Sequence, residues 1–229
     1  MQPSDWADPP GTKSLGAGVT DSQWPDSDGM SASLSAYRFL EARIRGAYYL
    51  PGRRLVAEEI AKELHMSRMP VREAFRRLAT EGLITLRANR GAVVTELGRE
   101  EIREIFLMRA ALESLAAAQA VQRLNAQHFA ELEQRLARME QAQHDPQQWV
   151  TLHYEFHDYL SSISGLPRLR KMVFQLHNLI EPCMRVWMGQ SHNLLEAKIC
   201  HEQLMEALRS GDAVRVEAEV RRHVLSTGI

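Results

Sequence analysis

Three arginines spaced four residues apart dominate the segment "SRMPVREAFRRL", residues 67–78. On a helix that turns about 100° per residue, Arg68, Arg72 and Arg76 form one stripe. Guanidinium groups bind phosphates through paired hydrogen bonds and read the major-groove edge of guanine. A second stripe, about a third of a turn away, is apolar and suits burial: Val71, Ala74, Phe75 and Leu78. The pattern predicts a helix whose apolar face packs on the protein and whose arginine face contacts nucleic acid. The alternative is an arginine face that is only exposed to solvent.

Four histidines in the second half of the chain are of a type that ligates metals. The segment "LHYEFHDYL" places His153 and His157 four residues apart, on one face of one helix. His201 and His223 lie on two later predicted helices. Neutral imidazoles that converge inside a helical bundle would suit Zn, Ni, Mn or Fe. The alternative is a polar core of hydrogen-bonded histidines.

Short elements must surround the arginine helix to position it. Apolar spacing predicts a helix over residues 34–49, stopped by "LPG", and a second one over residues 57–64. Ser67 is a good N-cap for the arginine helix, and Pro70 is tolerated because it lies in the first turn. Gly82 is the expected end of this third helix.

Two β-rich runs, "LITLRA" and "AVVTEL", follow the arginine helix and predict a β-hairpin. Asn89, Arg90 and Gly91 join them, and these residues would reach an adjacent DNA groove or the backbone. Three helices followed by such a hairpin make a winged helix-turn-helix, which we expect over residues 34–97.

The rest of the chain has a helical pattern throughout, with no convincing strand. The fold class is therefore mostly α, with an N-terminal winged helix-turn-helix and a C-terminal all-helical bundle of about six helices over residues 99–226. Breaks at polar, Gly and Pro residues separate these expected helices: about 99–124, 126–143, 147–164, 167–188, 191–209 and 212–226. Residues 1–33, rich in Pro, Gly, Ser and Asp, predict a disordered tail.

Composition narrows the class of protein. The 229 residues carry a net charge of −1, but residues 34–98 hold twelve Lys and Arg against seven Glu. A basic block between acidic segments indicates an anionic partner, and nucleic acid is the obvious one. No apolar run reaches the roughly 18 residues of a membrane helix, and no secretory signal is evident. We therefore expect a cytoplasmic protein in which Cys183 and Cys200 are buried, reduced thiols.

The segment "EEIAKELHMSRMPVREAFRRLATEGLITLRANRGAVV" closely resembles the DNA-binding domain of GntR-family bacterial transcriptional regulators. The resemblance implies that Arg68 and Arg72 make the main base and phosphate contacts and that Ser67 contacts a phosphate. Met69 stands where the family usually has Thr, and His65 replaces a usual Gly in the turn. The DNA-binding residues implied are Ser67, Arg68, Met69, Arg72, Arg76, Asn89, Arg90 and Gly91.

The helical half resembles the effector-binding domain of the FadR subfamily of the same family. The resemblance rests on short motifs: "RAALE" (109–113), "FH" (156–157), "H…AL.SGD" (201–212) and "RRH" (221–223). It implies a divalent metal bound by His153, His157, His201 and His223, and a small carboxylic acid effector. In the family the position of His153 is usually acidic. Four neutral ligands leave the site more positive than one acidic ligand and three histidines would, and this favours Zn or Ni over Mn.

Arg109 matches a family arginine that faces the effector pocket, and the resemblance implies that it pairs with the effector carboxylate. The alternative for Arg109 is an ordinary salt bridge to Glu113, four residues later on the same helix.

The function implied is a ligand-responsive regulator, such as a repressor, that binds double-stranded operator DNA as a homodimer. A constitutive DNA-binding protein without an effector is one alternative. A metal-dependent hydrolase is another, but "HYEFH" is not H-E-x-x-H, because Glu155 takes the third place, and no nucleophile motif is present. We therefore expect no enzymatic activity.

Overall fold

The computed structural model describes residues 31–87, 91–188 and 194–227. The first 30 residues of the predicted tail lie outside the described residues. Its last three residues begin helix α1 (Ala32–Arg45), because Ser31 takes the N-cap position and its hydroxyl accepts a hydrogen bond from the backbone N–H of Leu34. The helix thus begins two residues before the expected start at residue 34.

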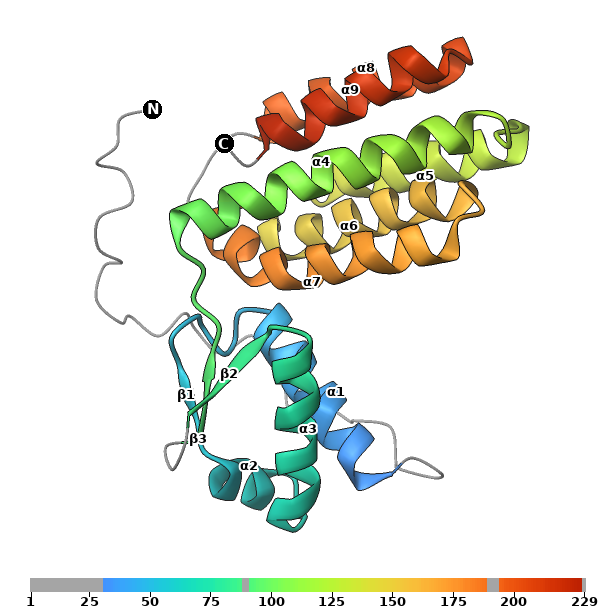
Figure 1. Ribbon diagram of the computed structural model, residues 1–229. Coiled ribbons are helices and arrows are strands. Elements are labelled where there is room, and N and C mark those ends of the chain that lie inside the picture. The colour runs from blue at the N-terminus through green and yellow to red at the C-terminus, as the bar shows by residue number, and fades with distance from the viewer. Residues whose placement is uncertain (1–30, 88–90, 189–193, 228–229) are drawn as a thin grey trace. The chain divides into compact units, whose positions relative to one another are not determined.

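The N-terminal elements form three helices and a small antiparallel sheet among the described residues, coloured blue to green in Figure 1. They are α1, β1 (Arg54–Leu55), α2 (Ala57–Glu63), α3 (Arg68–Thr80), β2 (Ile84–Arg87) and β3 (Gly91–Val94). The hairpin β2–β3 confirms the predicted wing. Strand β1 was not predicted: it pairs with β3, so that β3 lies between β1 and β2.

The predicted end of the first helix at residue 49 was wrong. Helix α1 ends at Arg45, with Gly46 as its C-cap, and Ala47 takes a left-handed backbone conformation with φ +55°. This turn reverses the chain four residues before "LPG". It allows the Tyr49 side chain to enter the same core as α1 and α3.

Helix α3 confirms the two stripes predicted from the sequence. Val71, Ala74, Phe75 and Leu78 are buried, and the helix ends where Gly82 adopts φ +79°. Ser67 occupies the N-cap position but its side chain makes no capping hydrogen bond, contrary to the prediction. Its exposed hydroxyl is therefore not used to hold the helix.

The C-terminal half is a bundle of helices, which confirms the predicted fold class. Its members are α4 (Arg99–Val121), α5 (Ala126–Gln141), α6 (Pro146–Ile163), α7 (Pro167–Met188), α8 (Leu194–Ser210) and α9 (Ala213–Ser226). Side chains of Asn125, Asp145 and Asp212 cap α5, α6 and α9, as the polar breaks in the sequence suggested. Among the helices described, none combines the length and the apolar composition that a membrane span requires.

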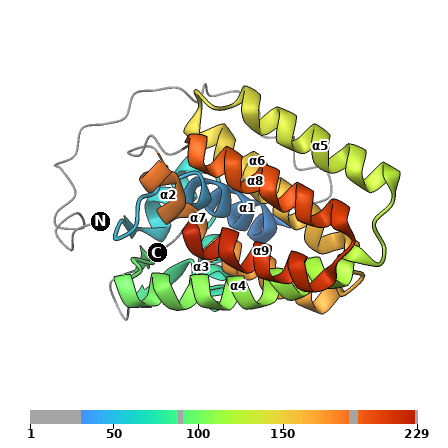
Figure 2. The same cartoon turned by 90° about the horizontal axis from the view of Figure 1, so that it is seen from above.

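Helix α4 packs against three other helices of the bundle. It lies along α9 and also packs against α6 and α7, and both views show the α4–α9 pair side by side (Figures 1 and 2). Small buried residues on α4, including Ala110 and Ala117, suit this close approach. The expectation of two buried thiols holds only for Cys200, because Cys183, although also free, is partly exposed.

Candidate functional site

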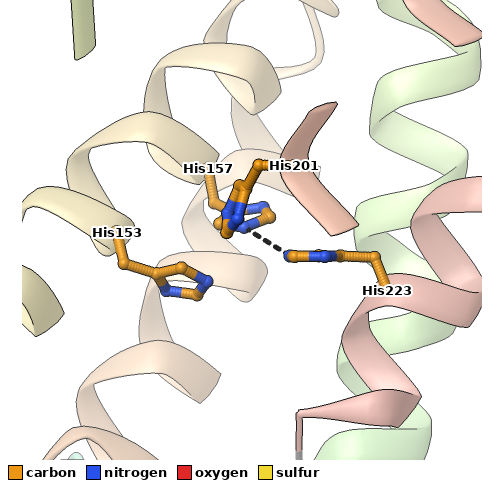
Figure 3. Close-up of side chains that lie close together, drawn as sticks. All are labelled: His153, His157, His201 and His223. Atoms are coloured by element: carbon orange, nitrogen blue, oxygen red, sulfur yellow. Dashed lines mark hydrogen bonds between the residues drawn. The ribbon is translucent and has the colours of Figure 1, made fainter. Parts of the chain in front are cut away.

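The four candidate metal ligands meet inside the bundle. His153 and His157 come from α6, His201 from α8 and His223 from α9, and Figure 3 shows their rings converging. One nitrogen from each ring lies within 4.8 Å of the others, and all four residues are buried. We call this set the histidine cluster.

The geometry of the histidine cluster fits a divalent metal. In a tetrahedral Zn site with Zn–N distances of about 2.1 Å, two ligand nitrogens lie about 3.4 Å apart, so a contraction of at most roughly 1.4 Å would complete the site. His153 Nε2 and His223 Nδ1 are buried and have no hydrogen-bond partner among the described residues. An unsatisfied buried polar atom costs roughly 1–3 kcal/mol. These two nitrogens are therefore available to a ligand.

The protonation state of the cluster also suits a metal. Burial lowers the pKa of His153, His157 and His223 well below the ordinary value, and the neighbouring histidines lower it further, because protonated rings would repel one another. These imidazoles are therefore neutral near pH 7, as metal ligands must be.

Glu113, on α4, links the histidine cluster to two further buried groups. Its Oε1 atom accepts hydrogen bonds from Arg109 Nε and from His177 Nε2, each at 2.8 Å. Its Oε2 atom lies 3.4 Å from His157 Nδ1. Burial alone would raise the pKa of Glu113, but Arg109 and His177 beside it lower that pKa well below the ordinary value. The carboxylate is therefore ionised.

Arg109 makes the salt bridge that the sequence offered as the alternative. Its side chain is 1% exposed, pairs with Glu113 four residues later and lies over the Phe106 ring. The guanidinium is thus inside the domain, near the cluster, but already has a carboxylate partner.

Several buried polar residues of this interior were not identified from the sequence. His177 and Asn178 come from α7 and Tyr154 from α6, and the Tyr154 hydroxyl and Asn178 Oδ1 have no hydrogen-bond partner among the described residues. Glu181 and Arg185 form a second buried ion pair on α7. The sequence did contain a pattern that could have identified them. Polar residues stand at positions 177, 181 and 185, and this four-residue spacing places them on one face of α7.

The arginine face, defined as Arg68, Arg72 and Arg76, is exposed along α3. The Met69 side chain, on the same first turn, is also exposed. A contact between Arg68 and Glu58 at 3.5 Å is a surface pair, which is worth only about 0–1 kcal/mol and is easily exchanged for another anion.

Of the three candidate DNA-binding residues in the wing, only Gly91 lies in the described part of the chain. Gly91 begins β3 with φ +82°, and a Cβ atom there would lie 2.8 Å from the Leu55 carbonyl oxygen. The tight approach of β1 to β3 therefore requires glycine. Asn89 and Arg90 lie outside the described residues.

Two protein-family models match the chain, one in each half. The model described as "Bacterial regulatory proteins, gntR family" matches residues 32–94, which hold α1 to β3. The model described as "FCD domain" matches residues 104–226, more than half of the chain, which hold the histidine cluster.

Known transcriptional regulators are similar to this chain over most of their length. The Nta operon transcriptional regulator of Aminobacter aminovorans is 31% identical over 180 residues, 77% of this chain and 85% of that protein. The HTH-type transcriptional regulator McbR of Escherichia coli is 35% identical over 149 residues, 64% of this chain and 67% of that protein. The solved structure of E. coli McbR/YncC has a TM-score of 0.76 at 27% identity and covers 86% of this chain and 95% of its own. The chain therefore belongs to the GntR family of bacterial transcriptional regulators, and its helical half is an FCD domain.

Proposed function

We propose that this DNA-binding regulator senses a small carboxylic acid in its FCD domain with the help of a divalent metal ion, Zn or Ni, and that it binds operator DNA as a homodimer. The observation that carries the proposal is the histidine cluster: four buried imidazoles with their nitrogens within 4.8 Å of one another. A buried polar atom is costly when nothing bonds to it, and His153 Nε2 and His223 Nδ1 have no hydrogen-bond partner among the described residues.

DNA binding is assigned to the arginine face and the wing. The guanidiniums of Arg68, Arg72 and Arg76 project from one exposed side of a helix that is the right width for the major groove. Ser67 and Met69 lie on either side of Arg68 at the start of α3. In the wing, Asn89, Arg90 and Gly91 would reach the neighbouring DNA backbone or groove.

The metal is assigned to His153, His157, His201 and His223. When bound, it would supply two positive charges to an interior in which these four ligands contribute none, and so attract an anion. Arg109 would then add a second anchor for the effector carboxylate. Because Arg109 already pairs with Glu113, the effector would share that guanidinium rather than meet a free one.

The response to the effector is a shift between two arrangements of the dimer. An acid that binds the FCD domain more tightly in one arrangement would favour it. The two winged helices would then span a different half-site spacing, and operator affinity would change.

A thermal-shift screen tests the proposal. Chelator-treated protein is heated with small carboxylic acids, each with and without added Zn or Ni. A rise in melting temperature that needs both metal and one acid supports the metal-assisted sensor. A rise with metal alone supports the metal site but not the acid. No response to metal or acid would refute the sensing part and favour a constitutive DNA-binding regulator.

A further inference from the structure

Glu113 contacts one member of the histidine cluster and two groups outside it. The carboxylate is 3% exposed, and both hydrogen bonds it accepts, from Arg109 and His177, end on the same oxygen, Oε1. The other oxygen, Oε2, is buried, has no hydrogen-bond partner among the described residues and lies 3.4 Å from Nδ1 of His157. An ionised oxygen without a donor therefore faces one particular nitrogen of the cluster.

The nearby carboxylate favours one position of the proton on the His157 ring. An ionised carboxylate can only accept hydrogen bonds, so it favours the ring form with the proton on Nδ1. A neutral imidazole has one N–H, and Nε2 is then left with its lone pair. That lone pair points toward the rest of the cluster, because His157 Nε2 lies 3.1 Å from His223 Nε2.

We propose that Glu113 is a positioning residue for the metal: it holds His157 with the proton on Nδ1 and so presents Nε2 to the ion. The inference rests on the metal site proposed above, although the proton position itself does not. A metal-ligating histidine usually donates its other N–H to a carboxylate or carbonyl group, and losing that partner weakens metal binding. Here the same carboxylate is also the partner of Arg109, so one residue joins the metal ligand to the proposed effector anchor.

The competing explanation is that Glu113 serves only as the counter-ion of Arg109. The two explanations differ in what Glu113→Gln does. The amide oxygen would stay with the Arg109 N–H, which places the amide NH₂ toward His157 Nδ1. A donor there favours the opposite ring form, with the proton on Nε2 where the metal must bind. A pure counter-ion role predicts lost stability without a change in the ring form.

The first test uses the wild-type protein. The ¹⁵N chemical shifts of the ring nitrogens are measured in chelator-treated protein near pH 7, and His157 is assigned by comparison with His157→Gln. A protonated Nδ1 and an unprotonated Nε2 are expected. A protonated Nε2 would overturn the proposal. This measurement requires neither metal binding nor a stable variant at position 113, so it stands even if the metal site fails.

The second test measures Zn and Ni affinity by competition with a chelator of known affinity. Glu113→Gln should weaken binding about 10–100-fold. The matched control is Glu181→Gln, because Glu181 is also buried and pairs with arginines, Arg185 four residues away and Arg45, rather than with a histidine. The control should leave metal affinity unchanged. Equal affinities of wild type and Glu113→Gln, or equal losses in both variants, would show that Glu113 is only a counter-ion.

Discussion

The Nε2 atoms of His157, on α6, and His223, on α9, lie 3.1 Å apart in the interior of the FCD domain. Two imidazole nitrogens at this distance need one proton between them, because two facing lone pairs repel. A metal held by both nitrogens would take the place of that proton. It would also link α9 to α6.

Metal should therefore stabilise the protein. At about 100 times its dissociation constant, Zn or Ni adds about 2.7 kcal/mol to the free energy of unfolding, which is a rise of roughly 5–10 °C in melting temperature for a chain of this size. The rise should be lost in His223→Gln. His144→Gln, which changes an exposed histidine outside the cluster, is the control and should keep it. An equal rise in both variants would place the metal elsewhere.

Acid should destabilise the metal-free protein between about pH 7.5 and 5.5. The unfolded chain protonates its histidines near the ordinary pKa of 6.5, whereas burial lowers the pKa of His153, His157 and His223 well below that value in the folded chain. The unfolded state thus binds more protons, and stability falls as the pH falls, by up to about 1.4 kcal/mol per pH unit for each histidine. Urea denaturation at several pH values measures this. A flat profile would contradict the assigned protonation state.

Arg72→Ala should weaken operator binding by roughly 1–3 kcal/mol while leaving the fold intact. The duplex for the assay is selected from random sequences by the wild-type protein, and affinity is measured by gel shift at fixed salt. Arg103→Ala is the matched control, because Arg103 is an exposed arginine on α4 and the change in charge is the same. If both variants bind like the wild type, α3 is not the recognition helix.

Gly91→Ala should destabilise the protein more than Gly211→Ala. Both glycines have positive φ, +82° and +69°, so both changes carry a cost of about 1–2 kcal/mol for the left-handed backbone. Only at Gly91 would the new Cβ also meet a backbone atom, the Leu55 carbonyl oxygen at 2.8 Å, whereas nothing lies within 4 Å at Gly211. Equal losses in urea denaturation would mean that the wing accommodates the methyl group.

Local patterns were enough to predict much of the fold. The burial of Phe75 and the exposure of Arg72 follow from a 3.6-residue repeat, which any helix imposes on its own sequence. The bundle helices began and ended close to the expected residues, because capping residues such as Asn125 and Asp212 act within one turn. Strand β1 could not be predicted in this way, because two residues carry no periodicity. Its first residue, Arg54, pairs with Val93, which is 39 residues later in the chain.

The sequence by itself determined that His153 and His157 share a helix face, and that Arg109 and Glu113 are four residues apart. The resemblance added His201 and His223 to the same site. Only the tertiary structure decided that Arg109 is already paired, that His177 shares its carboxylate and that Glu113 faces Nδ1 of His157. The reason is physical: spacing fixes which side chains lie on one helix face, but contacts between helices depend on how each helix is rotated against its neighbours, and that rotation is set by the whole core.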